Sequence, residues 1–146
     1  MSETKAAGLR SQPPIRVVSR PGPPLGLIFG AIGGLAALVI GILHLDRLPI
    51  ALCYTKVLTG LPCPTCGSTR ALGRLFALDV AGALAMNPLA ALAALVLAAW
   101  AIADFALLPR RRALGLEVAP RTATLLRVAA FSALALNWAY LVAVGR

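Results

Sequence analysis

Two cysteines, Cys63 and Cys66, stand three residues apart in a segment rich in proline and glycine. Thiols at the start of a helix are favoured as thiolates by the backbone N–H groups and by a nearby cation such as Arg70. A thiolate of this kind attacks disulfides, and two neighbouring thiols can close into one. The spacing therefore predicts a redox dithiol as one chemistry, with Cys63, Cys66 and Arg70 as candidate catalytic residues.

The remaining cysteine and the single histidine allow two other chemistries. A Cys-x-x-Cys pair is half of a tetrahedral zinc site, which Cys53 and His44 could complete. Full zinc sites usually contain two such pairs, so no cofactor is predicted and zinc at Cys53, Cys63, Cys66 and His44 stays an alternative. A third interpretation is a structural disulfide from Cys53 to either motif cysteine, on the oxidising side of a membrane.

The composition places this chemistry in a membrane protein. Of the 146 residues, 60% are hydrophobic and 13% are charged, and the mean hydropathy is +0.86. A soluble domain has roughly 45–50% apolar and about 25% charged residues. The formal charge of +9 lies at the ends of apolar segments, without the basic stripe that marks a nucleic-acid interface. The sequence thus excludes a nucleic-acid partner and predicts the lipid bilayer as the main one.

Three apolar runs are long enough to cross a bilayer as helices, which takes about 20 residues each. We predict spans at about 25–43, 88–108 and 125–144. Asn87 is expected to cap the second helix, with Pro88 at its first position, where a missing N–H has no cost. The predicted fold class is an all-α membrane protein with about three transmembrane helices.

The rest of the chain divides around these spans. Residues 1–24 combine five prolines with basic and polar residues and are predicted to be a disordered basic tail. Residues 25–146 form a single membrane domain, in which 44–87 is the loop that carries the cysteines. Within the loop, Ser68 or Thr69 is expected to cap a short amphipathic helix over 71–78 that lies at the membrane interface.

Polar and aromatic side chains near the ends of the runs have conventional interpretations. Asp104 lies near the end of the second run, where we expect it to reach the headgroups or to pair with the basic cluster 110–112. Arg127 is expected to snorkel to the interface at the start of the third span. Trp138 and Tyr140, near the other end of that span, are typical of an aromatic belt.

Small residues recur along the first span. Gly26, Gly30 and Gly34 are four residues apart, and a second row beside them includes Gly33 and Gly41. Such a face lets another helix approach closely. We therefore predict helix–helix association through Gly26, Gly30 and Gly34.

The distribution of lysine and arginine predicts the orientation. Nine basic residues fall on one side and five on the other: Lys5, Arg10, Arg16, Arg20, Arg110, Arg111, Arg112, Arg121 and Arg127 against Arg47, Lys56, Arg70, Arg74 and Arg146. The positive-inside rule then places the amino terminus in the cytoplasm and the cysteine loop outside it.

The motif resembles the signature of a bacterial family of small multi-pass membrane proteins, domain of unknown function 2752. The resemblance is carried by Cys53, by Gly60-Leu61-Pro62-Cys63-Pro64-Thr65-Cys66-Gly67-Ser68-Thr69-Arg70-Ala71 and by Asn87-Pro88-Leu89. It implies a multi-pass protein of the bacterial plasma membrane, without an established activity. The structural motif residues are Gly60, Pro62, Pro64, Gly67, Thr69, Asn87 and Pro88. The chain departs from the family at Asn137-Trp138, inside the third run, so no role is assigned to the last helix.

These observations favour a non-enzymatic accessory or structural protein. Its rigid Cys-x-x-Cys loop would dock a membrane or extracytoplasmic protein partner. A thiol-disulfide oxidoreductase that uses Cys63 and Cys66 is the first alternative, and a metal-binding loop is the second. Paired carboxylates, a Ser-His-Asp set and a nucleotide fingerprint are absent from the sequence, which gives no support to hydrolase or kinase activity.

Overall fold

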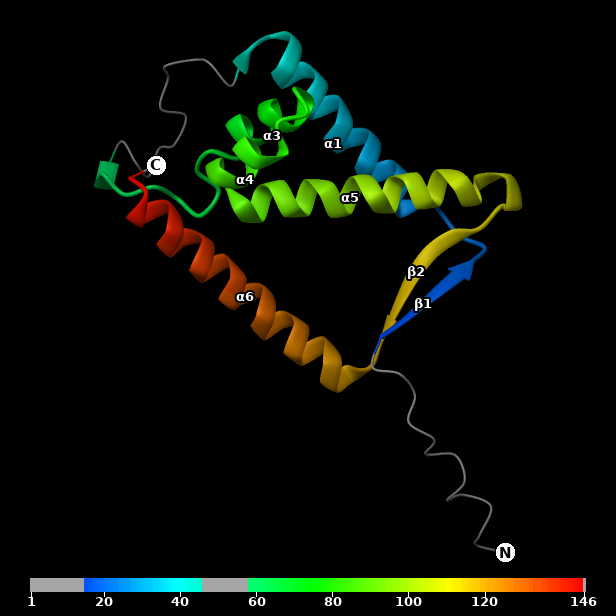
Figure 1. The fold of residues 1–146 in the computed structure, drawn as a ribbon. Helices are drawn as coiled ribbons and strands as arrows, with labels where there is room; N and C mark the ends of the chain where they lie inside the picture. The colour runs from blue at the N-terminus through cyan, green and yellow to red at the C-terminus, as the bar shows by residue number, and fades with distance from the viewer. Residues whose placement is uncertain (1–14, 46–57, 146) are drawn as a thin grey trace, which may run out of the picture.

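The computed structural model describes residues 15–45 and 58–145, and over these ranges the chain is mostly helical. Three long apolar helices are accompanied by two short helices and a two-stranded sheet (Figure 1). In chain order the elements are β1 (Ile15–Arg20), α1 (Leu25–Ile42), α3 (Ser68–Phe76), α4 (Val80–Met86), α5 (Pro88–Leu107), the 3₁₀ turn η2 (Leu108–Arg110), β2 (Ala113–Val118) and α6 (Pro120–Ala143).

Helices α1, α5 and α6 are long and apolar enough to cross a membrane, which confirms the predicted fold class. The apolar segments span 18, 23 and 24 residues, or about 27–36 Å of helix at 1.5 Å per residue. Only 6–11% of the residues in their most apolar windows are buried inside the protein. The outer surface of these helices is therefore suited to lipid rather than to water.

The helix bounds agree closely with the predicted spans at α1 and α5, but α6 begins earlier than expected. It starts at Pro120, so that Arg121 and Arg127 lie within the helix, both exposed. Proline at the first helical position supplies a favourable φ without losing a hydrogen bond, which explains the early start. The charged residues limit the apolar part of this helix without ending it.

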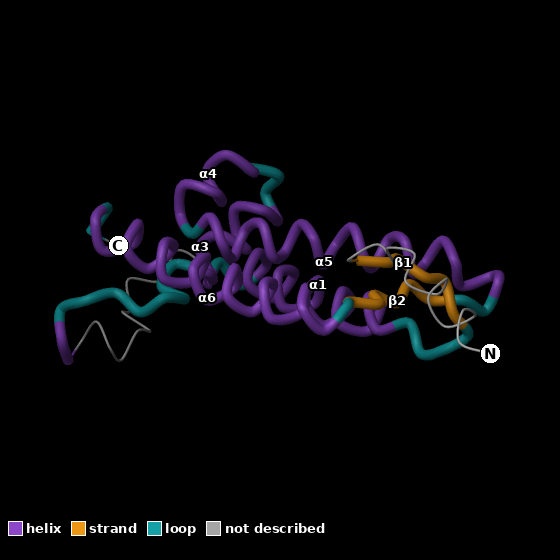
Figure 2. The backbone as a smooth tube through the Cα atoms, turned by 90° about the horizontal axis from the view of Figure 1, so that it is seen from below, coloured by secondary structure: helices purple, strands orange, loops and turns teal. Residues whose placement is uncertain are grey.

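Different elements lie at the two ends of the long helices α1 and α5. The sheet lies where α1 begins and α5 ends, whereas α3 and α4 lie at the opposite end, beside the last turns of α1 and the start of α5 (Figures 1 and 2). Helix α6 approaches α5 near the start of α5 and diverges from it toward the sheet (Figure 1). The cysteine motif and the sheet therefore lie at opposite ends of the helices.

Close packing between α1 and α5 depends on two of the predicted glycines. A Cβ atom at Gly26 would lie 2.5 Å from the Trp100 ring, and one at Gly30 would overlap the Ala101 methyl group. At Gly34, by contrast, an added Cβ meets no atom within 4 Å. The close approach predicted for this glycine row thus occurs within the chain, at Gly26 and Gly30 but not at Gly34.

Replacing Gly30 by leucine should lower the free energy of unfolding by about 1–3 kcal/mol, because the larger side chain cannot fit against Ala101. Unfolding in mixed micelles measures the change. Gly34→Leu is the matched control, since it adds the same atoms to the same helix where the space is open. Equal losses in the two variants would contradict the proposed contact.

The sheet corrects the prediction for part of the amino-terminal tail. Residues 1–14 lie outside the described residues, but Ile15–Arg20 forms β1, which pairs antiparallel with β2. Val17 lies opposite Leu116, and Arg20 forms an ion pair with Glu117. The β-branched residues of this segment favour a strand once a partner is present, and the partner is more than 90 residues away in the sequence.

Asp104 also differs from its predicted role. Its side chain is fully buried and forms no ion pair with the basic cluster 110–112. Instead, one carboxylate oxygen accepts a hydrogen bond from the Gly26 amide and the other accepts one from the Leu114 amide, both at 2.8 Å. This single carboxylate joins the first turn of α1 to β2 and to the end of α5.

Candidate functional site

The two motif cysteines lie at the ends of one tight turn. The Cys66 amide donates to the Cys63 carbonyl at 2.9 Å, and the Ser68 amide then donates to the Thr65 carbonyl at 3.1 Å. Pro64 occupies the second position of the first turn, where its fixed φ favours a turn. The two consecutive turns lead the chain directly into α3.

Gly67 connects these turns to the helix. Its φ of 81° is in the left-handed region, and it is the residue that precedes the first residue of α3. An added Cβ would also lie 3.4 Å from the Met86 carbonyl oxygen. The short helix therefore begins at Ser68 without a side-chain cap, whereas the sequence predicted a cap from Ser68 or Thr69. The Ser68 hydroxyl donates to the Thr65 carbonyl instead, at 2.7 Å.

Three side chains from outside the turn bind its carbonyl groups. Trp138 Nε1 donates to the Pro62 oxygen at 2.8 Å, Asn137 Nδ2 donates to the Pro64 oxygen at 3.0 Å, and Asn87 Nδ2 donates to the Cys66 oxygen at 3.0 Å. The carbonyls of Cys63 and Thr65 accept from the turn itself. Every carbonyl from residue 62 to residue 66 is thus hydrogen-bonded.

The two asparagines also bind the first turn of α5. Asn87 Oδ1 accepts from the Ala90 amide at 3.0 Å, as predicted for a helix cap, and Asn137 Oδ1 accepts from the Leu89 amide at 3.1 Å. Asn87 is 1% exposed and Asn137 is 5% exposed. A buried amide is costly unless both of its ends are bonded, and here both ends are. The cysteine turn, the start of α5 and the end of α6 are therefore held as one unit.

The sulfur atoms themselves lie at the edge of this unit. Cys63 and Cys66 are both half-buried thiols, and within residues 58–145 they are not joined to each other by a disulfide. Cys63 Sγ lies 3.3 Å from the Thr65 hydroxyl, within hydrogen-bond distance for sulfur. Cys53 lies outside the described residues, so the predicted disulfide to it stays a prediction.

The predicted metal ligands do not come together in the described part of the chain. Over residues 15–45 and 58–145, no three His, Cys, Asp or Glu side chains are arranged to hold a metal ion. His44 lies two residues after the last residue of α1, with a left-handed φ of 48°. The predicted zinc site also includes Cys53, which lies outside the described residues, so zinc at the full set stays a prediction.

The remaining predicted motif residues surround the turn. Gly60 has a left-handed φ of 73°, Pro62 is buried, and Thr69 is half-buried in the first turn of α3. Pro88 is the first residue of α5, as predicted. Arg70 is exposed on α3. Their positions agree with a folded motif in which only Arg70 and the two thiols offer reactive or charged groups.

A comparison with known protein families agrees with the predicted resemblance. Residues 53–101 match DUF2752, a family described as a protein of unknown function. No curated protein and no solved structure matches the chain. The DUF2752 segment contains the cysteine turn, α3, α4 and most of α5.

Helix α6 lies outside the DUF2752 segment and yet contributes three side chains to the site. Besides Asn137 and Trp138, the Tyr140 hydroxyl donates to the Ala85 carbonyl of α4 at 2.9 Å. The sequence predicted no role for the last helix and did not predict that these residues belong to the site. Asn137 is the residue that could have indicated this from the sequence, because an amide side chain inside an apolar run requires hydrogen-bond partners in the membrane.

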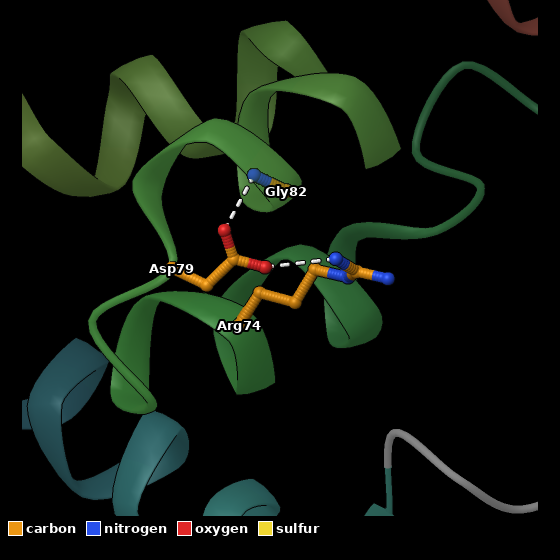
Figure 3. A network of polar contacts seen from close by, with 3 residues as sticks. All are labelled: Arg74, Asp79 and Gly82. Carbon is orange, nitrogen blue, oxygen red and sulfur yellow. Dashed lines mark hydrogen bonds and ion pairs between the residues drawn. The ribbon is translucent and has the colours of Figure 1, made fainter.

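A second polar network orders the part of the DUF2752 segment between the turn and Asn87. Asp79 precedes α4, a helix that the sequence did not predict, and accepts from the Gly82 amide at 2.8 Å. Its other oxygen pairs with the Arg74 guanidinium at 2.8 Å (Figure 3). The Gly82 amide, and after it the Arg74 guanidinium, lower the pKa of Asp79 below its ordinary value.

Asp79→Asn should destabilise the α3–α4 pair at neutral pH, and the difference from the unaltered chain should shrink on acidification. A carboxyl group with a lowered pKa stabilises the fold above its unfolded pKa of about 3.9, and this contribution is lost as the pH falls through the lower folded value. Melting temperatures of both chains at pH 7 and near pH 3 measure the effect. An equal difference in melting temperature between the two chains at both pH values would contradict this contribution of the Asp79 carboxylate. The effect should be small, because the pair is exposed.

Proposed function

We propose that the chain is an accessory protein of the bacterial plasma membrane whose helices hold the cysteine turn in one conformation as a docking element. The supporting observation is the bonding of every carbonyl from residue 62 to residue 66, three of them by side chains of other elements. A loop that only connects two helices needs no such bonding, because water or headgroups satisfy exposed carbonyls. A preorganised loop, in contrast, loses less conformational entropy when it binds.

The surface of the turn supports a protein rather than a nucleotide or another small anion as the partner. Thr65 is exposed at the middle of the turn, and Leu58 and Leu61 nearby in the chain are 66% and 48% exposed. Exposed apolar side chains beside a fixed polar turn are typical of protein interfaces. We infer a membrane or extracytoplasmic protein as the partner.

The charge distribution supports the side of the membrane on which docking occurs. Arg20, Arg121 and the cluster 110–112 lie at the sheet end of the helices, opposite the cysteine turn. In the positive-inside arrangement the sheet end is cytoplasmic and the turn is outside. At the turn end, Arg74 is paired with Asp79, so part of the basic charge there is compensated.

Labelling of intact cells with a membrane-impermeant maleimide tests this orientation. In a Cys53→Ser background, Cys63 and Cys66 should be labelled from outside, if necessary after treatment with a reductant. A cysteine introduced at Arg111 in a chain without the natural cysteines is the matched control and should be labelled only after permeabilisation. The reverse pattern would contradict the orientation.

Photocrosslinking in cells tests the docking function. A photoreactive residue at Thr65 should give a discrete protein adduct, and one at Val96, which is 66% exposed on α5, should not give that adduct. Asn137→Ala and Trp138→Phe should weaken the Thr65 adduct, because they release the Pro64 and Pro62 carbonyls. Leu136→Ala, at a 72% exposed position of the same helix, is the control. An adduct that persists unchanged when both carbonyls are released would contradict a fixed docking element.

A further inference from the structure

The geometry of the cysteine turn supports a chemical activity beyond docking. The bond from the Cys66 amide to the Cys63 carbonyl closes a four-residue turn, in which the end α-carbons are less than about 7 Å apart. A disulfide needs α-carbons roughly 4.4–6.8 Å apart. The turn therefore permits a Cys63–Cys66 disulfide with little movement of the backbone, although the two residues are thiols in the structure.

We propose that Cys63 and Cys66 are a dithiol site that reduces disulfide bonds in a docked protein by thiol-disulfide exchange. This inference rests on the proposed function, because the same fixed turn presents both thiols to the partner. It assigns the substrate class, a protein disulfide, and an order of attack in which Cys63 is the entering thiol.

The position of Thr65 supports Cys63 as the entering thiol. The Thr65 hydroxyl is 3.3 Å from Cys63 Sγ and can donate to a thiolate there. Thr65 itself is exposed, so the contact lies on the accessible face of the turn. Cys66 is restrained on both sides, since its amide binds the Cys63 carbonyl and its carbonyl binds Asn87. This restraint keeps the second thiol within the same turn while the first is bound to substrate.

The exchange proceeds in two balanced steps. The Cys63 thiolate attacks one sulfur of the substrate disulfide, which forms a mixed disulfide and releases the other substrate sulfur as a thiolate. The Cys66 thiolate then attacks Cys63 Sγ, which closes the Cys63–Cys66 disulfide and releases the second substrate thiolate. The protons lost by the two cysteines end on the two substrate thiols. Two electrons pass from the protein dithiol to the substrate, and a further thiol reductant restores the dithiol.

Purified full-length protein carrying Cys53→Ser tests this reaction with oxidised glutathione as the probe. The reduced chain should release two molecules of glutathione thiol per chain and end with an internal disulfide, detected by mass and by loss of both maleimide-reactive thiols. Adding Cys66→Ser should stop the reaction at one released thiol, with one glutathione bound at Cys63. Adding Cys63→Ser instead should leave Cys66 slow to react, with little mixed disulfide.

Two outcomes would overturn the proposal. One is a stable glutathione adduct, without an internal disulfide, in the chain that keeps both Cys63 and Cys66. The other is an equal rate of adduct formation at Cys63 and at Cys66 in the two serine variants. The fluorescence of Trp138 in a Trp100→Phe background verifies that each variant keeps the site folded. Crosslinking at Thr65 in a Cys63→Ser/Cys66→Ser chain separates the two proposals, since docking can persist when exchange fails.

Discussion

Replacing Asn87 by alanine is expected to lower the free energy of unfolding by roughly 2–4 kcal/mol and to release the cysteine turn. The change removes the cap of α5, because Asn87 Oδ1 accepts from the Ala90 amide. It also leaves the Cys66 carbonyl without the donor that Asn87 Nδ2 supplies at 3.0 Å. Unfolding in mixed micelles measures the stability, and the rate of maleimide labelling at Cys63 in a Cys53→Ser background measures the release.

Asn87→Ser separates the two contributions. A serine hydroxyl can still cap α5 but is too short to reach the Cys66 carbonyl. This variant should therefore recover part of the stability while the labelling of Cys63 stays fast. A chain with Asn87→Ala that labels as slowly as the unaltered protein would show that the asparagine is a helix cap only. The turn would then owe its order to Asn137 and Trp138 instead.

The sequence predicted those parts of the fold that depend on neighbouring residues. The long apolar runs predicted α1 and α5 to within one residue, because lipid selects for length and composition. Asn87 and Pro88 predicted the start of α5 for a similar reason, since a cap and a first-turn proline act within four residues of chain. The turn at Pro64 and the left-handed Gly67 also depend on local residues, and the sequence indicated them only as motif positions.

The parts that the sequence did not predict depend on contacts between distant segments. Asn137 and Trp138 donate to carbonyl groups 73 and 76 residues away in the sequence. A carbonyl acceptor leaves no signal in the sequence, because every residue has one. Trp138 also fits an aromatic belt, and that interpretation concealed its bond to Pro62. The sequence also did not predict strand β1, because its partner β2 is a distant segment that comes after α1 and α5 in the chain.

Asp104→Ala is expected to lower the free energy of unfolding by about 3–5 kcal/mol, at least as much as Asn87→Ala. This substitution acts at the opposite end of the molecule. The carboxylate is fully buried and accepts two backbone hydrogen bonds, from Gly26 and from Leu114, both at 2.8 Å. Without it, both amides lose their acceptor, and the hydrogen-bonded link from α1 to β2 is lost. Trypsin should then cleave faster within the cluster 110–112, between α5 and β2, while the labelling of Cys63 changes little.

Two matched variants make this prediction specific to the carboxylate. Ile102→Ala, on the same helix at a position that is 70% exposed, should leave both stability and cleavage unchanged. Asp104→Asn keeps one acceptor oxygen but turns a donor toward the other amide, so it should fail to restore stability although its shape is nearly the same. An asparagine variant as stable as the unaltered chain would show that packing, rather than the pair of acceptor oxygens, joins α1 to β2. Asn87, Asn137 and Trp138 hold the cysteine turn, and Asp104 does not. In the Asp104→Ala variant, proteolysis should therefore detect unfolding at the sheet end while the cysteine turn stays folded.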